Sequence, residues 1–416
     1  MNRREFSAGC LAIAGTALLR ETARPESLTA LPPWREGELH IHQIDTGRGN
    51  ACFLIFPDAT TMLIDCGTSN DDLSVSAPRR PDSSRRPGEW VARYAMHHAP
   101  AANRDRIDYA LVTHIHPDHV GDIPPGMSAS ADGYIPTGIS QVDSLMSIDR
   151  VIDRGFPDYG PWQPLKAPFA TNYLAWLKSR VRRGRAVVSA QVGSAEQIAI
   201  RRTNRFPDFS VRVISANGTV WTGAGRESRS AFPPPKEIPA NDWPDENLYS
   251  VAIHLRYGRF SYYSGGDLEA DTRDGRLPWR DVESRAAEVV GQTEVAVANH
   301  HAYFDACGPA FTKQLDAQAY IIPAWHVTHP GQAQLQRLLG AWPGNTIRDV
   351  FATEMLGANC LFNARWATQL RSRQGHVVVR VAPGGDSYRI FVLDSLHEDA
   401  PVVYSSGTYL CRNRAQ

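Results

Sequence analysis

Three histidines and one aspartate fall within six positions of this chain, directly after an apolar run. They are His114, His116, Asp118 and His119. Neutral imidazole and carboxylate groups are the side chains that bind zinc, manganese and iron in proteins. Ligands two positions apart on an irregular loop can converge on one ion, while the adjacent Asp-His pair reaches a second ion. The spacing therefore predicts a metal site, with a loop of incidental surface histidines as the alternative.

The apolar run before these residues predicts the element that positions them. Residues 107–112 have the length and β-branched content of a buried strand, so the histidines should lie where a strand ends, at the rim of a sheet. Other candidate residues also follow predicted strands: Asp65 and Asp267 after hairpins, His300 and His301 after a short strand. Asp65 could hold the second ring nitrogen of a ligand histidine, or could be a simple turn carboxylate. Two glycines before Asp267 let the chain turn and present its carboxylate as a bridging ligand.

The hydrophobic periodicity predicts a mixed α/β protein. Strands are expected at residues 39–45, 51–56, 61–64, 107–112, 187–190, 211–216, 249–256, 260–263, 295–298, 319–322, 349–352, 377–381 and 388–393, and helices at 90–98, 171–183 with Thr171 as its cap, 282–290, 309–315 and 332–339. From residue 123 to about 243 the periodicity is poor, which predicts a loop-rich insertion that shapes a substrate cleft. Residues 69–88, rich in Ser, Pro, Asp and Arg, are expected to run over the surface.

The order of these signals resembles that of the metallo-β-lactamase-fold hydrolases. Four details look like the branch that contains the hydrolase domain of the DNA-internalisation competence protein: Gly47-Arg48-Gly49-Asn50, Ile64-Asp65-Cys66-Gly67, Asn247-x-x-Ser250 and His300-His301. The resemblance implies an α/β (α+β) fold, a four-layer αββα sandwich with a metal centre along one edge of its two sheets.

The resemblance also implies roles for single residues. His114 and His116 would bind one ion, Asp118 and His119 the other, Asp267 would bridge them, and His300 or His301 would complete the site. Asp118 would also orient the attacking hydroxide, and His329 is a candidate acid near the leaving group, with a structural histidine in a His-Pro turn as the alternative. The family's ligand histidine between the two hairpins is not evident, because Asn247 to Ser250 occupy its neighbourhood. The expected cofactor is one or two divalent ions, zinc or manganese.

These residues favour a metal-dependent hydrolase that attacks its substrate with a metal-activated hydroxide. The first expectation, by analogy with that branch, is a phosphodiester substrate. A lactone, β-lactam or thioester on the same centre is the alternative, and a non-catalytic exported binding protein with the same fold is the second alternative. Lys+Arg and Asp+Glu both number 44, so the net charge does not indicate nucleic acid as a partner.

The N-terminus predicts export. Arg3 and Arg4, followed by Phe6 and an uncharged run over residues 8–19, resemble a twin-arginine signal of a bacterial periplasmic or extracytoplasmic protein. A lipoprotein signal is rejected because the apolar run follows Cys10 instead of preceding it. The expected organisation is a signal peptide at residues 1–23, a hydrolase domain at 36–395 and a tail at 396–416, with no membrane span in the mature chain. Cys52 and Cys66 are expected as buried free thiols, with a disulfide as the alternative.

Overall fold

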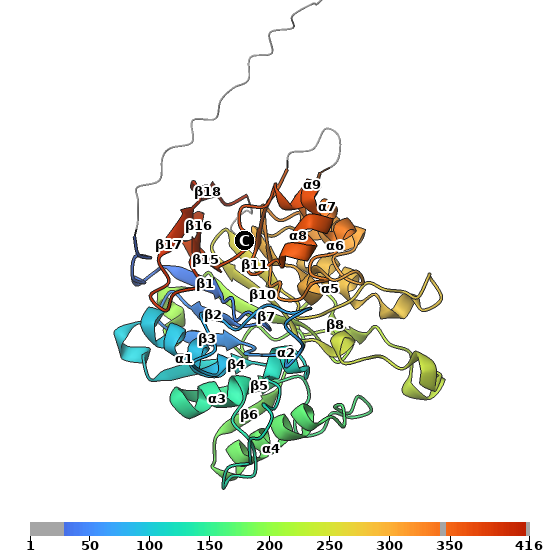
Figure 1. Ribbon diagram of the computed structural model, residues 1–416. Coiled ribbons are helices and arrows are strands. Elements are labelled where there is room, and N and C mark those ends of the chain that lie inside the picture. Colours follow the sequence, from blue (N-terminus) through green and yellow to red (C-terminus); the bar gives the residue numbers. More distant parts are fainter. Residues whose placement is uncertain (1–28, 342–346, 413–416) are drawn as a thin grey trace, which may run out of the picture.

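The computed structural model describes residues 29–341 and 347–412, which form two sheets with helices on both outer faces (Figure 1). The first sheet has the order β17-β16-β15-β1-β2-β3-β4-β5-β6, with β18 also paired to β16. Its strands are β1 (Leu39–Gln43), β2 (Cys52–Ile55), β3 (Thr61–Ile64), β4 (Arg106–Leu111), β5 (Ser147–Asp153), β6 (Ala186–Ser189), β15 (His376–Val381), β16 (Ser387–Leu393), β17 (Val402–Ser405) and β18 (Tyr409–Leu410).

The second sheet has the order β14-β13-β12-β11-β10-β7-β8-β9. Its strands are β7 (Phe209–Ala216), β8 (Thr219–Trp221), β9 (Ser228–Ser230), β10 (Ala252–Tyr257), β11 (Phe260–Ser264), β12 (Val295–Val297), β13 (Ala319–Ile322) and β14 (Asp349–Ala352). In each sheet the central hairpin is antiparallel and the strands that follow it are parallel, β3 to β6 in one and β11 to β14 in the other. Parallel strands end at the same edge, and this edge carries the candidate metal ligands.

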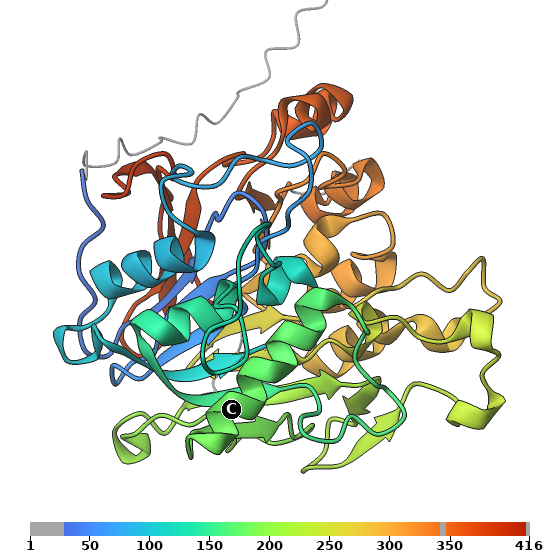
Figure 2. The same cartoon turned by 60° about the horizontal axis from the view of Figure 1, so that its bottom comes forward.

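Alternating side chains along each strand divide the apolar residues between two faces. Met62 and Ile64 pack with Ile253 and Leu255 in a core between the two sheets, whereas Leu63 faces the helices. The helices that cover the first sheet are α1 (Pro87–His98), α3 (Gly138–Leu145) and α4 (Pro168–Arg182), and those on the second are α5 (Val282–Val290), α6 (Pro309–Leu315) and α7 (Gln332–Leu339), as Figures 1 and 2 show. The expected four-layer αββα sandwich is confirmed.

The other helices are short. They are the α-helices α2 (Pro117–Val120), α8 (Gly357–Phe362) and α9 (Ala364–Ala367) and the 3-10 helices η1 (Ala101–Asn103), η2 (Thr203–Arg205), η3 (Pro235–Glu237), η4 (Ala240–Asp242), η5 (Asn247–Tyr249), η6 (Pro278–Arg280) and η7 (Asn299–Ala302). Of these, α2, η5 and η7 lie at the candidate site.

The middle of the chain is more regular than its sequence suggests. Residues 123–243 were expected as a loop-rich insertion with strands at 187–190 and 211–216. They supply β6 and β7 at those places and, in addition, β5 to the first sheet and β8 and β9 to the second. The expected cap at Thr171 is wrong, because α4 begins three residues earlier with Pro168 in its first turn and Ala167 at the cap position. The division of the chain into domains stays a prediction.

The C-terminal end of the chain belongs to the first sheet. Residues 396–416, expected as a tail, include β17 and β18, which pair with β16. The expected signal peptide, residues 1–23, lies outside the described residues. Cys52 and Cys66 are buried free thiols, as expected. Among the described residues no helix combines the length and the apolar character needed to cross a bilayer.

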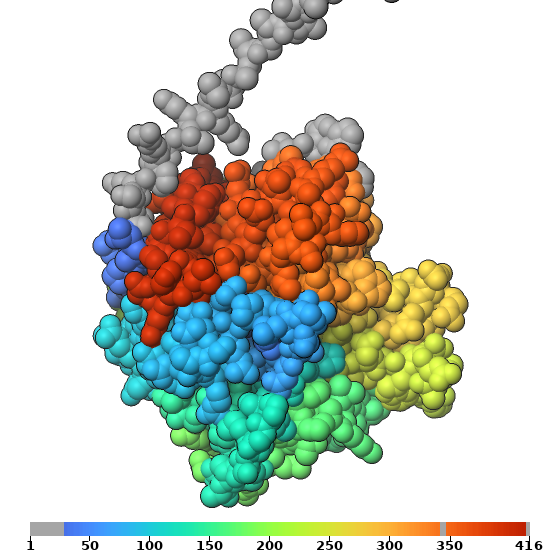
Figure 3. Space-filling view, in the orientation of Figure 1, coloured from blue at the N-terminus to red at the C-terminus, as the bar shows by residue number. Residues whose placement is uncertain are grey.

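The Ser- and Arg-rich stretch of residues 69–88 crosses the front of the molecule in Figure 3. It is tied to the loop after β13, because Ala77 N–H donates to the Trp325 carbonyl (2.9 Å) and Val327 N–H donates to the Val75 carbonyl (2.7 Å). The stretch of residues 69–88 therefore lies against the loop that contains His326 and His329.

A buried histidine in the first sheet predicts acid sensitivity. His376 Nδ1 accepts a hydrogen bond from the Asp45 amide (3.0 Å), and burial lowers the pKa of His376 to about 3. The unfolded chain therefore binds a proton below about pH 6.5 that the folded chain excludes, and stability falls as the pH drops from there toward 3. One such histidine costs about 2 kcal/mol between pH 8 and pH 5.

We expect His376→Asn, whose amide oxygen can accept the same bond, to lose about 2 kcal/mol less of its unfolding free energy than the wild type between pH 8 and pH 5. Urea unfolding at both pH values measures the difference. Equal pH dependence of the two proteins would contradict the assignment of this proton to His376.

Candidate metal centre

Four candidate ligands meet where the parallel strands of both sheets end. Asp118 and His119 lie on α2, just after β4; Asp267 follows β11, and His301 follows β12. Asp118 Oδ2 lies 3.6 Å from His119 Nε2 and 3.1 Å from His301 Nε2. Asp267 Oδ2 lies 3.2 Å from His119 Nε2 and 3.4 Å from His301 Nε2. We call these four residues the quartet.

The quartet has the geometry of a divalent cation site. All four ligand atoms lie within 4.8 Å of one another. Ligands about 2.1 Å from a tetrahedral ion are themselves about 3.4 Å apart, close to the distances seen here. His119 Nε2 is buried and makes no well-aligned hydrogen bond with any residue that the structure describes. Two carboxylates and two imidazoles suit zinc or manganese.

The charges of the quartet also favour a cation. Burial alone would raise the pKa of Asp118 and Asp267, yet His119 and His301 hold both well below their usual range. Burial alone would lower the pKa of His301, but Asp267 and Asp118 raise it to about 9. In the absence of metal, protons on the histidines balance the two carboxylates, so a bound cation would replace protons that the site already attracts.

Both histidines of the quartet are fixed through their second ring nitrogen. His119 Nδ1 donates to Asp65 Oδ2 (2.8 Å), and His301 Nδ1 donates to the Pro323 carbonyl (2.7 Å). Asp65 in turn accepts from the amide and the hydroxyl of Thr113 (both 2.8 Å). With Nδ1 protonated, each neutral ring presents the lone pair of Nε2 to the quartet, which is the usual arrangement behind a metal-ligating histidine.

Close backbone packing holds α2 at this place. A side chain on Gly67 would lie 1.8 Å from the carbonyl carbon and oxygen of Asp118, so only glycine fits there. The Asn50 amide donates to the Asp118 carbonyl (2.8 Å) and the Cys66 amide to the His119 carbonyl (3.0 Å). Helix α2 therefore packs directly against two turns, Gly47–Asn50 and Asp65–Gly67.

Asp267 is the centre of a wider ring of imidazoles. Besides the quartet histidines, His114 Nε2 lies 3.7 Å and His300 Nε2 lies 3.9 Å from Asp267 Oδ2. The turn before it needs a positive φ of 57° at Gly266, and the Asp267 amide donates to Ser250 Oγ (3.0 Å). One carboxylate oxygen thus faces four histidine nitrogens.

The adjacent histidines of η7 both face this oxygen because their backbone is unusual. In extended chain successive side chains point to opposite sides. His300, His301 and Ala302 instead have positive φ values of 44°, 52° and 58°. Such conformations cost non-glycine residues free energy and concentrate at functional sites.

His300 has its own orienting carboxylate. Its Nδ1 donates to Asp305 Oδ1 (2.7 Å), and its Nε2 lies 3.3 Å from the amide nitrogen of Asn247. Burial alone would lower the pKa of His300, but the Asp305 hydrogen bond and the charge of Asp267 raise it to about 9. His300, Asp305 and Glu269 also lie within 4.8 Å of one another, although Arg280 already pairs with Glu269 (3.2 Å).

His114 and His116 stand beside the quartet. His114 Nε2 lies 3.0 Å from His116 Nδ1, and burial lowers the pKa of both residues. Two ring nitrogens this close can share one proton or face one cation. The structure therefore brings all predicted metal ligands to one place.

His329 has a different position from that expected of a proton donor. Its ring is buried and stacks on His301, with centroids 4.8 Å apart and planes 13° from parallel. Burial and the charge of His301 keep the pKa of His329 well below its usual range. This position suits the alternative, a structural histidine that packs on His301, and the role of His329 as an acid near the leaving group stays a prediction.

Some residues at the site were not identified from the sequence. They are Glu246, Asn247 as a neighbour of His300, Glu269 and Asp305. Asp305 lies only four residues beyond His301 in the sequence. This short spacing was the one signal that could have identified it as a residue of the site. Glu246 reaches the site only through the pairing of the two halves of the chain.

Comparison with known proteins adds three findings. One similar solved structure is that of a "putative metal-dependent hydrolase" from Parabacteroides distasonis ATCC 8503, 12% identical, with a TM-score of 0.35 over 76% of this chain and 94% of that chain. No curated protein matches the chain. Residues 45–134, which hold Asp65 and the stretch from His114 to His119, match the model of the metallo-beta-lactamase superfamily, so this part of the chain carries the sequence pattern of that superfamily.

Proposed function

We propose that this protein is a metal-dependent hydrolase whose principal cation is held by the quartet. The observation that supports this most strongly is the meeting of Asp118, His119, Asp267 and His301 within 4.8 Å, from three separate segments and with orienting partners behind both histidines. A divalent cation there would lower the pKa of a coordinated water and stabilise negative charge on a substrate oxygen.

The residues of the site have separate tasks in this proposal. Asp118, whose side chain is 12% exposed, can be reached by water, and it would orient the attacking water and accept its proton. Asp65 would keep His119 in the tautomer that leaves Nε2 free. The stacked ring of His329 would fix the plane of His301.

A second cation position is proposed on the other side of Asp267. His114 and His116 contribute to it, and His300 supplies the nitrogen that the resemblance expected from a histidine between the hairpins. His300 and His301 would then serve different cations across one bridging carboxylate. The Asp305 hydrogen bond would orient His300 as Asp65 orients His119.

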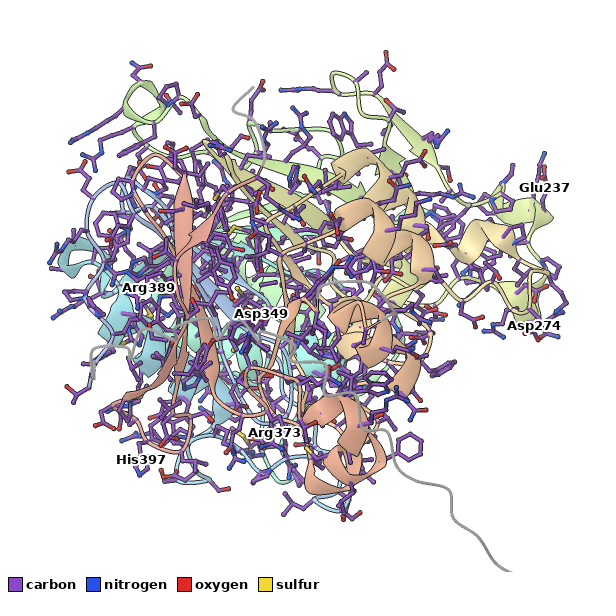
Figure 4. The ribbon with its side chains drawn as sticks, turned by 90° about the horizontal axis from the view of Figure 1, so that it is seen from above. Glu237, Asp274, Asp349, Arg373, Arg389 and His397 are labelled. Carbon is purple, nitrogen blue, oxygen red and sulfur yellow. The ribbon has the colours of Figure 1, made fainter. Side chains whose placement is uncertain are left out.

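The proposed substrate class is a phosphodiester, which rests on the resemblance of the glycine turn and the His300-His301 pair to the competence-protein branch. Two loops that continue directly from site residues project together from one side of the molecule, where Figure 4 labels Glu237 and Asp274 near their tips. They precede Asn247 and follow Asp267, respectively. We propose that these loops shape the substrate cleft.

Turnover by the zinc- or manganese-loaded protein tests the substrate class. We expect hydrolysis of bis(p-nitrophenyl) phosphate, and loss of that hydrolysis in Asp118→Ala. Nitrocefin and simple lactones are assayed in parallel. Activity on these alone would move the proposal to the acyl-transfer alternative. Less than half an equivalent of metal, with Asp118→Ala unchanged in every assay, would favour the non-catalytic binding protein.

We further propose export by a twin-arginine signal, supported by Arg3, Arg4 and the uncharged run that follows. This route carries folded proteins, which suits a metalloenzyme that is loaded before transport. Cell fractionation should place the wild type outside the cytoplasm and an Arg3→Lys/Arg4→Lys variant inside it. An unchanged distribution would overturn the proposal.

A further inference from the structure

A carboxylate outside the metal ligands fixes the backbone between His114 and His116. Glu246 Oε1 accepts a hydrogen bond from the amide of Ile115 (2.9 Å). Ile115 is fully buried, and Glu246 is 2% exposed. Glu246 precedes Asn247 and η5, so it belongs to the second half of the chain, whereas the two histidines belong to the first.

Arg154 holds that carboxylate from the other side. Its Nε lies 2.6 Å from Glu246 Oε1, and its Nη2 lies 2.9 Å from Oε2. Its remaining nitrogen donates to the Trp162 carbonyl (2.9 Å) and to Asn217 Oδ1 (2.8 Å). The guanidinium lies between the rings of Tyr159 and Tyr249, 4.7 Å from each centroid. Such a planar, fully engaged guanidinium permits one position of its partner.

Neighbouring backbone bonds anchor the segment that follows Glu246, one to the strand end before His114 and one to the turn that holds Asn217. The Val251 amide donates to the Thr113 carbonyl (2.9 Å), and the Asn217 amide donates to the Tyr249 carbonyl (3.0 Å). The chain that follows Glu246 is therefore anchored, and the Glu246 carboxylate is the contact that reaches the backbone between the two histidines. By contrast, α2 rests on the Gly47–Asn50 and Asp65–Gly67 turns, so Asp118 and His119 do not depend on Glu246.

We propose that Glu246 and Arg154 act as a clamp that sets the separation of His114 and His116, and thereby maintains the second cation position without touching a cation. This inference rests on the proposed function, because it assumes that the protein binds two cations. Glu246 and Arg154 are positioning residues in this account.

The test is the titration of the metal-free protein with Zn²⁺ by calorimetry. The wild type should bind two equivalents. Glu246→Ala should retain the first and bind the second about 10- to 100-fold more weakly, as is typical when an orienting partner is lost. Glu246→Gln, whose amide oxygen can still accept from Ile115, should recover part of that affinity.

Asp143→Ala is the matched control for a merely structural effect. Asp143 also accepts from a buried strand amide, that of Ile148 (3.0 Å), and pairs with a buried arginine, Arg180 (2.7 Å), away from the quartet. Its removal should lower stability and leave both Zn²⁺ affinities within about threefold. If Glu246→Ala does not fold, Arg154→Lys and Glu246→Gln take its place, with weakening of the second site alone expected.

The outcomes separate the inference from the function on which it rests. Two unchanged equivalents in the Glu246 and Arg154 variants would overturn the clamp and leave the hydrolase proposal standing, and so would equal weakening in Asp143→Ala. A single equivalent in the wild type would overturn the clamp as well, since no second position would exist. A wild type that binds no Zn²⁺ and hydrolyses nothing would overturn the proposed function itself.

Discussion

Asp267→Asn is expected to lose most of its bound metal and to reduce hydrolysis by about 10³-fold or more. The reason is the position of Asp267 Oδ2, which lies within 3.9 Å of the Nε2 atoms of His119, His301, His114 and His300. An amide at this place has nearly the same shape but removes the negative charge that both cations would share. Metal analysis and initial rates at saturating metal measure the two effects.

Asp271→Asn is the matched control for that change. Asp271 lies four residues further along the same loop, with its side chain 34% exposed, and should leave the metal content unaltered. Full activity and full metal content in Asp267→Asn would contradict the proposed role of Asp267 as a ligand of both cations. Equal losses in both variants would indicate a disturbed loop instead of a lost ligand.

His300→Ala is expected to reduce bound metal from two equivalents to one, whereas His301→Ala should remove the cation of the quartet. The difference follows from the distances: His301 Nε2 lies 3.1 Å from Asp118 Oδ2, whereas His300 Nε2 lies 3.9 Å from Asp267 Oδ2 and His300 Nδ1 is bound to Asp305. Asp305→Asn should weaken only the second cation, by about 10- to 100-fold.

The control for the histidine variants is His397→Ala, because the His397 side chain is 65% exposed and its Nδ1 bonds to Asp394 (2.9 Å). It should bind metal as the wild type does. Two equivalents in His300→Ala would contradict a ligand role for His300, and a loss in His397→Ala would point to a general effect of the substitutions on folding.

Much of the fold follows from local sequence patterns. The helices α5, α6 and α7 and the strands β13 and β14 have the predicted bounds, since each is a short amphipathic or apolar run between clear breakers. The ligand positions followed from a simple rule: side chains just after parallel strands meet at one sheet edge. Asp118, Asp267 and His301 come together for that reason.

The middle of the chain was not predictable in the same way. β5 exposes Ser147, Asp149 and Arg150, so its apolar pattern is broken, and β9 is exposed along its whole length. These strands owe their conformation to pairing with neighbours, β5 with β4 and β9 with β8. Pairing with a neighbouring strand leaves little trace in local composition.

The details of the site that depend on long-range contacts were also hidden. No local pattern shows that Glu246 reaches the amide of Ile115, or that His300 and His301 adopt left-handed backbone and face the same oxygen. The choice between these two histidines was open in the sequence, and the geometry gives each of them a separate neighbour. In the proposed centre, His300 takes the place of the ligand histidine that the resemblance expected between the two hairpins.

The quartet is proposed to hold a divalent cation. The most direct measurement is metal content after equilibrium dialysis of the metal-free wild type against Zn²⁺ or Mn²⁺, alongside a variant that carries both Asp118→Ala and His301→Ala. We predict at least one equivalent in the wild type and less than a tenth in the double variant. Less than half an equivalent in the wild type with either metal, or equal content in both proteins, would contradict the account.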